Sequence, residues 1–157
     1  MPRRHPIHPT RYAERADLAA LLALEEATFD SDRISRAQWR RHIDSATVAI
    51  LVGGRGGVDA AAVVSYRRNS RSARLYSLAV DARARGLGLG GALLAAAEAD
   101  ARARGCTAMR LEVRTDNLAA ITLYERHGYV RGARISGFYE DGADAWRYAK
   151  TLTTVTS

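Results

Sequence analysis

A glycine-rich run at residues 85–91, RGLGLGG, carries the clearest chemical signal in this sequence. It follows a predicted strand over residues 73–80 and leads into a predicted helix that ends at Gly105. Glycines in such a turn let the main chain approach a ligand closely and present its N–H groups. The helix that begins near Gly88 adds its positive end, so the run predicts an anion site suited to a pyrophosphate. Three glycines in a first helical turn cost on the order of 1 kcal/mol each relative to alanine, which favours a ligand over tight packing as their reason.

Two phosphate-binding motifs compete for this run. It lacks the Gly-Lys-Ser/Thr ending of a P-loop. Gly86, Gly88 and Gly91 do fit G-x-G-x-x-G, with Glu112 at a suitable distance, so a Rossmann-type nucleotide-binding protein is an alternative. Against it, five residues separate Val80 from Gly86, and Glu112 lies inside its predicted strand rather than at the strand's exit.

Length and composition narrow the class of protein. The chain has 157 residues, which supports one domain, expected over residues 7–157 after a flexible tail at 1–6. A single cysteine, Cys106, excludes an internal disulfide, and the two histidines in the HPIHP segment lack a third metal ligand, so no metal site is predicted. No apolar run approaches the roughly 20 residues of a membrane span. We therefore expect a cytoplasmic protein that does not bind a membrane.

The charge balance favours anionic partners. The formal net charge is +7, and Lys150 is the only lysine among 24 basic residues. Arginine makes forked contacts with phosphate and carboxylate groups, which fits a phosphorylated cofactor, an acidic protein or a nucleic acid. An arginine-rich nucleic-acid-binding module ranks last, because the basic residues are dispersed and no basic-aromatic stripe accompanies them. A composition bias that raises arginine and alanine together is an equally weighted explanation.

The periodicity of the remaining segments predicts an α/β or α+β domain with a mixed sheet. Ser35 is expected to cap a helix that carries Trp39. In the helix after the glycine run, Leu89 and Leu93 are expected to face the sheet, while Glu98 faces water. The predicted strands span 7–12, 47–52, 58–67, 73–80, 109–114, 129–138 and 145–152, and the other two helices span 17–29 and 117–127.

These residues resemble the GNAT family of acetyl-CoA-dependent N-acetyltransferases. The family's pyrophosphate loop matches Arg85, Gly88 and Gly90, and the segments on either side, LAVDARARGLGLGGALL and LEVRTDNLAAITLYERHGY, follow in the family's order and spacing. The match covers residues 73–152 well and the first third only in outline. Within the family, the chain looks most like ribosomal-protein-alanine N-acetyltransferases and their uncharacterised relatives, through residues 111–114, Asn117, 123–125, 138–139 and 142–145.

The resemblance implies a mixed, mostly antiparallel central sheet of about seven strands flanked by about four helices. It implies acetyl-CoA as co-substrate, with the pantetheine arm between two strands that splay apart, and an amine acceptor such as a protein N-terminus, a peptide or a small amine. The last two predicted strands, 129–138 and 145–152, are compatible with a homodimer. The implied cofactor-binding residues are Leu78, Ala79, Val80, Arg85, Gly86, Leu87, Gly88, Leu89, Gly90, Gly91 and Asn117.

The resemblance also assigns two catalytic roles. Glu112 matches the glutamate that accepts the amine proton through water, and Tyr124 matches the tyrosine that protonates the departing thiolate. From the residues alone, Glu112 could equally pair with its arginine neighbours, and Tyr124 could be a packing residue. Phe29 and Tyr139 are the expected substrate-binding residues. The loop at 29–34 lacks the family's usual proline and tryptophan, and four aspartates predict an acidic acceptor mouth, Asp30, Asp32, Asp141 and Asp144.

Overall fold

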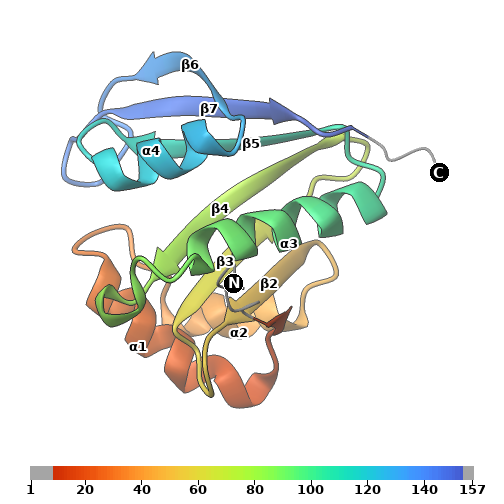
Figure 1. Cartoon of the computed structure of the whole chain (residues 1–157), viewed down its shortest axis with the longest axis vertical. Helices are drawn as coiled ribbons and strands as arrows, with labels where there is room; N and C mark the ends of the chain where they lie inside the picture. Colours follow the sequence, from red (N-terminus) through yellow and green to blue (C-terminus); the bar gives the residue numbers. More distant parts are fainter. Residues whose placement is uncertain (1–8, 154–157) are drawn as a thin grey trace, which may run out of the picture.

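The structure, a computed structural model, describes residues 9–153. Those residues form one seven-stranded sheet with the strand order β1-β2-β3-β4-β5-β7-β6 (Figure 1). The predicted tail at 1–6 and the start of the first predicted strand lie outside the described residues. The strands are β1 (Thr10–Tyr12), β2 (Val48–Gly53), β3 (Ala60–Ser65), β4 (Ser72–Val80), β5 (Ala108–Arg114), β6 (Val130–Ile135) and β7 (Ala145–Thr151). The α-helices are α1 (Leu18–Thr28), α2 (Arg36–Asp44), α3 (Leu89–Ala103) and α4 (Leu118–Arg126).

The sheet divides where β4 meets β5. All other neighbouring strands pair antiparallel, whereas β4 and β5 pair parallel from Ser72–Ala108 to Leu75–Leu111. Beyond Leu75, β4 continues along β3 and β5 continues along β7, so the two strands separate toward the carboxyl end of each (Figure 1). The predicted splay of these strands is therefore present.

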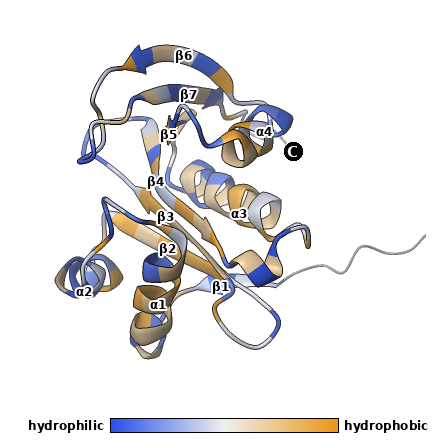
Figure 2. Cartoon of the chain, turned by 90° about the vertical axis from the view of Figure 1, so that its left-hand side faces the viewer, coloured by the Kyte–Doolittle hydropathy of each residue, from blue (hydrophilic) through white to orange (hydrophobic). Residues whose placement is uncertain are grey.

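Helices cover the two faces of the sheet unequally. Helices α1 and α2 pack on one face of β2, β3 and β4 through a core that includes Leu21, Trp39 and Val63. Helices α3 and α4 pack on the other face through a larger core that includes Leu93 and Leu111 (Figure 2). The mixed, mostly antiparallel sheet with seven strands and four α-helices among the described residues confirms the predicted fold class. No helix in residues 9–153 is long and apolar enough to cross a lipid bilayer.

Local sequence signals explain how α2 begins. Ser35 accepts a hydrogen bond from the Gln38 N–H, and the Gln38 side chain accepts one from the Ser35 N–H. This reciprocal capping box satisfies two N–H groups that the first helical turn leaves unpaired, as predicted for Ser35. Trp39 then lies buried under the helix.

Helix α3 departs from the sequence prediction at Glu98, which is buried rather than exposed to water. Its carboxylate accepts hydrogen bonds from Lys150 Nζ of β7 at 2.7 Å and from the Tyr129 hydroxyl at 3.1 Å. Both partners lie more than thirty positions along the chain, so helical periodicity alone could not find them. The pairing compensates a carboxylate that would otherwise be costly to bury.

A second buried carboxyl, that of Glu25, holds the loop between α1 and α2. Its Oε1 accepts a hydrogen bond from the Ile34 N–H at 3.0 Å. Burial raises the pKa of this carboxyl from its ordinary value, against the opposing effects of the Ile34 hydrogen bond and the Arg33 charge. The folded state therefore holds this proton more tightly than the unfolded chain, and its stability falls as pH rises through the raised pKa.

We expect Glu25→Gln to raise the free energy of unfolding at pH 7, because glutamine keeps an oxygen for the Ile34 N–H but carries no charge to bury. The difference from the wild type should vanish at about pH 4, where the buried carboxyl is protonated. Urea denaturation at the two pH values measures both. A variant less stable than the wild type at pH 7 would contradict this account.

Candidate active site

The gap between β4 and β5 exposes backbone groups of β4. The Asp81 N–H donates to the Asp59 carbonyl at 2.8 Å, so the Asp81 amide points toward β3. The register pairs Ala79 with Ala61 and Leu78 with Ala62. Because antiparallel partners alternate in the direction of their amide groups, Ala79 bonds toward β3, whereas Leu78 and Val80 point their N–H and C=O groups into the gap. Two of the three predicted backbone positions thus face an open strand edge.

The glycine run lies at the end of this gap. A short 3-10 turn, η2 (Ala82–Ala84), separates it from β4. Gly86 and Gly88 both have φ of +83°, a left-handed conformation that L side chains rarely adopt, and Gly88 is the N-cap of α3. A Cβ at either glycine would meet only open space. Backbone conformation, and not crowding within the fold, therefore requires glycine at these two positions.

The other two glycines serve packing. A Cβ on Gly90 would lie 3.0 Å from Leu123 Cδ2, and one on Gly91 would lie 2.9 Å from His127 Nε2. Both neighbours belong to α4 or its C-cap, so these glycines let the start of α3 approach α4 closely. The prediction that tight packing does not explain the glycines of the first turn is therefore wrong for Gly90 and Gly91. Gly86 and Gly88 stay candidates for the predicted anion site.

Tyr124 lies on α4 with 6% of its surface exposed. Its ring packs edge-on against Tyr129, with centroids 5.8 Å apart. Burial, reinforced by Tyr139, raises the pKa of the Tyr124 hydroxyl above its ordinary value, so it carries its proton at neutral pH. Within residues 9–153 the hydroxyl has no hydrogen-bond partner. A protonated, unpaired hydroxyl is what a proton donor requires.

Glu112 lies on β5 just beyond the point where β4 departs. Its side chain is 5% exposed, and three arginines surround its carboxylate. Arg74 Nε lies 3.1 Å from Oε2, while nitrogens of Arg110 and Arg147 lie 3.6 and 3.5 Å from Oε1. The structure therefore contains the ion pairs between Glu112 and neighbouring arginines that the sequence allowed. A water molecule that passed a proton to this carboxylate would have to contact it alongside three arginine side chains.

Asn117 begins α4, and the two predicted substrate-binding residues, Phe29 and Tyr139, lie where α1 ends and between β6 and β7. Asn117 Oδ1 accepts a hydrogen bond from the Ala120 N–H at 3.2 Å, which confirms its capping role. Phe29 ends α1 and packs against the core beneath that helix. Burial raises the pKa of Tyr139 to about 12, and its ring lies 4.9 Å from the Arg114 guanidinium.

The loop after α1 contacts the loop between β6 and β7. Asp32 accepts hydrogen bonds from the Glu140 N–H at 3.2 and 3.3 Å. Asp141 pairs with Arg114, and Asp144 pairs with Arg134 at 2.8 Å. Arginines therefore neutralise two of the four aspartates from which an acidic acceptor mouth was predicted, and the basis for that prediction is weakened.

Comparison with known proteins agrees with this geometry. A model of the acetyltransferase (GNAT) family matches residues 16–129, and the chain belongs to that family. Over 83 residues the chain is 38% identical to N-alpha-acetyltransferase 30 of Schizosaccharomyces pombe, which covers 53% of this chain and 55% of that protein. The matches span about half or less of the curated relatives' lengths, 55%, 46% and 19%.

Two solved structures share the fold over nearly the whole chain. The ribosomal-protein-S18-alanine N-acetyltransferase from Escherichia coli superimposes with a TM-score of 0.82 at 26% identity, covering 96% of this chain and 97% of that one. Ard1 from Thermoplasma volcanium gives a TM-score of 0.82 at 27% identity, covering 94% and 99%. The predicted resemblance is thus confirmed. The antiparallel pairing of β3 with β4 and of β5 with β7 excludes the Rossmann alternative.

Proposed function

We propose that this protein transfers the acetyl group of acetyl-CoA to a primary amine by direct attack. One observation carries the proposal: the open edge of β4 and the glycine turn at the start of α3 meet at the same end of one strand. The edge offers amide groups to the pantetheine arm, and the turn offers N–H groups and the helix dipole to the pyrophosphate. Arg85 adds a positive charge beside that turn.

The chain's own groups supply two parts of the reaction. An N–H of Leu78 or Val80 donates a hydrogen bond to the thioester oxygen as charge develops on it. The amine nitrogen bonds to the acetyl carbon, the carbon–sulfur bond breaks, and the amine gives up a proton. Tyr124 gives its hydroxyl proton to the departing sulfur and recovers one from solvent. Acetyl-CoA, when bound, supplies the activated acyl group. No covalent bond to the protein is needed.

Glu112 remains the predicted acceptor of the amine proton through water, and Glu112→Gln tests that role. If Glu112 is the base, kcat should fall by roughly 10²- to 10⁴-fold. If the carboxylate only balances its three arginines, kcat should stay near the wild-type value and the change should appear in KM for the acceptor. Steady-state kcat and KM of the two proteins, measured with the same acceptor, separate the two roles.

Native mass spectrometry with CoA, followed by a thiol-release screen over peptides and small amines, tests the proposed activity. We expect one CoA to bind per chain and thiol release to depend on the amine. Gly88→Ala serves as the site variant, because a side chain there is strained at φ +83° and disturbs the turn. Absence of CoA binding at millimolar concentration, or equal binding by Gly88→Ala, would refute the site.

A further inference from the structure

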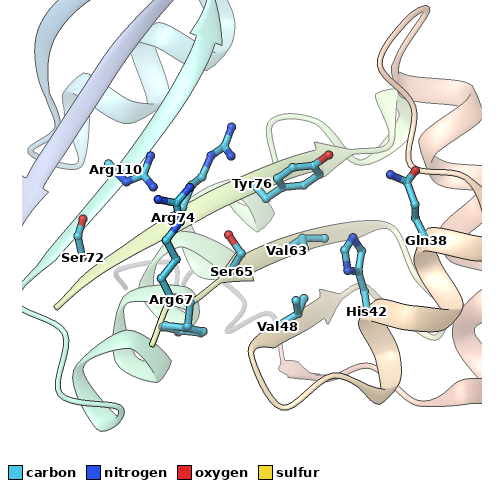
Figure 3. Close-up of a pocket in the computed structure, with 11 residues that line it drawn as sticks. Gln38, His42, Val48, Val63, Ser65, Arg67, Ser72, Arg74, Tyr76 and Arg110 are labelled. Atoms are coloured by element: carbon cyan, nitrogen blue, oxygen red, sulfur yellow. The ribbon is translucent and has the colours of Figure 1, made fainter. Parts of the chain in front are cut away.

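A cavity of about 270 Å³ opens between α2 and the sheet, on the face opposite α3 (Figure 3). Its lining comes from α2, from strands β2 to β5 and from the residues that follow β3. None of the residues predicted for catalysis or cofactor binding lines it. Its position on the α1–α2 face places it across the sheet from the glycine turn, which opens α3.

One end of the cavity is strongly basic. Arg67, Arg74 and Arg110 line it together, beside the hydroxyls of Ser65 and Ser72 (Figure 3). Arg74 and Arg110 are 28% exposed, so their guanidinium groups are partly withdrawn from solvent. Charges in such an environment interact more strongly with a ligand than charges in open water.

These three arginines outnumber the carboxylates that contact them. Glu112 is the carboxylate that contacts Arg74 and Arg110, and it is shared with Arg147. Within residues 9–153, Arg67 forms no ion pair. Burial, and then the charges of Arg74, Arg67 and Arg147, lower the pKa of the Arg110 guanidinium despite the opposing effect of Glu112. An incoming anion would relieve this mutual repulsion.

The other end of the cavity is polar and aromatic. Gln38 and His42 of α2 reach it, and Tyr76 lies between them and the arginines (Figure 3). The His42 ring packs at 6.1 Å from the Tyr76 ring, and its Nε2 is buried with no hydrogen-bond partner among the described residues. Burial, with the charge of Arg41, lowers the pKa of His42, so the ring is neutral at pH 7. This buried ring nitrogen beside the cavity can form a hydrogen bond that the described residues do not supply.

The cavity is aligned with the proposed reaction centre. Residues of β4 connect the two, since Arg74 and Tyr76 line the cavity and Leu78 faces the gap. A strand rises roughly 3.3 Å per residue, so Tyr76 and Arg74 lie roughly 7 and 13 Å from Leu78 along β4. A group held by the arginines would therefore belong to an extended acceptor whose amine reaches the gap.

We propose that this cavity binds a carboxylate or phosphate group of the acetyl acceptor, and so selects amines that carry an anion several bonds from the nitrogen. This inference rests on the proposed acetyltransferase function and names its substrate class. Arginine forks match the planar oxygens of a carboxylate and the oxygens of a phosphate. This basic cavity contrasts with the acidic acceptor mouth that the four aspartates predicted.

Matched acceptors test the proposal and its two sources of anion. Straight-chain ω-amino acids from glycine through aminobutyrate and aminohexanoate to aminooctanoate represent small acids, each compared with its amide. A peptide amide with glutamate at positions two and three, compared with its glutamine counterpart, represents acidic protein N-termini. We expect kcat/KM to favour the acid over its neutral match by roughly 10- to 100-fold, the range of charge-assisted hydrogen bonds. The preference should appear only when the spacer is long enough to reach Arg74.

Two variants assign the preference to the cavity. In Arg67→Gln and Arg110→Gln the ratio of kcat/KM for acid over amide should fall toward one. Arg55→Gln removes the same charge from the exposed turn between β2 and β3, and its ratio should stay at the wild-type value. Titration of the His42 ring resonances with aminooctanoate gives a readout independent of turnover, with shifts expected in the wild type and weakened in Arg110→Gln.

The outcomes separate this inference from the proposed function. Thiol release with equal kcat/KM for acids and amides would overturn the anion site and leave the acetyltransferase function intact. A preference that Arg55→Gln abolishes as much as Arg110→Gln would also overturn it, because net charge would then be its cause. A failure of CoA to bind, measured separately by native mass spectrometry, would refute both.

Discussion

Tyr124→Phe should lower kcat by roughly 10²- to 10⁴-fold, the usual contribution of a positioned proton donor. The thiolate of CoA, with a pKa near that of cysteine at about 8.5, is a modest leaving group that a proton assists. The raised pKa of the Tyr124 hydroxyl keeps that proton in place at neutral pH. Because the substitution removes one oxygen from a buried ring, CoA affinity should stay close to that of the wild type. Rapid-quench single turnovers and CoA titration measure the two effects separately.

Tyr129→Phe is the matched control for this experiment. Tyr129 packs edge-on against Tyr124, but its hydroxyl donates to Glu98 of α3. Its loss should reduce stability, because a buried acceptor loses a partner, and should leave turnover near the wild-type value. If the two variants lose turnover equally, packing rather than proton donation would explain Tyr124. A Tyr124→Phe variant with full turnover would remove Tyr124 from the mechanism.

The parts of the site that sequence predicts are those with local causes. The glycine turn, the cap at Ser35 and the cap at Asn117 each depend on a few adjacent residues, and the structure confirms all three. The splay of β4 and β5 also follows from the resemblance, since a family conserves how its strands diverge more readily than how its side chains pair. These elements position the backbone around the proposed cofactor site.

The parts that sequence misses depend on contacts between distant strands. Strand alternation places Arg110 and Glu112 on one face, but only the register of β4 with β5 brings Arg74 to them, and only that of β7 brings Arg147. The cavity under α2 requires that helix and strands β2 to β5 to meet. The glycine motif also suggests a ligand at Gly90 and Gly91, whereas packing explains both. Their close neighbours, Leu123 of α4 and His127 at its C-cap, cannot be identified from the motif.

Asp100 on α3 is the second side chain whose loss should have a large effect. It is 8% exposed and joins segments that the sequence leaves far apart. Its carboxylate accepts hydrogen bonds from the hydroxyls of Tyr12 in β1 and Tyr66 after β3, and from Arg104 Nε at 3.0 Å. The hydrogen bond to Asp100 raises the pKa of the Tyr12 hydroxyl, and burial together with the same acceptor raises that of Tyr66, so both hydroxyls carry their protons at neutral pH.

Asp100→Ala should therefore lower the free energy of unfolding by about 3 kcal/mol, because it strips one charged acceptor from two hydroxyls at once. Arg104 adds little to this loss, since it is partly exposed and can turn to water. Tyr12→Phe is the control: that ring is 57% exposed, so its hydroxyl can be solvated in either state and its removal should cost less than 1 kcal/mol. Urea denaturation gives both values. If Asp100→Ala costs no more than Tyr12→Phe, the buried carboxylate does not hold α3 to the first half of the sheet. The edge of β4 and the start of α3 would then depend for their alignment on the apolar core alone.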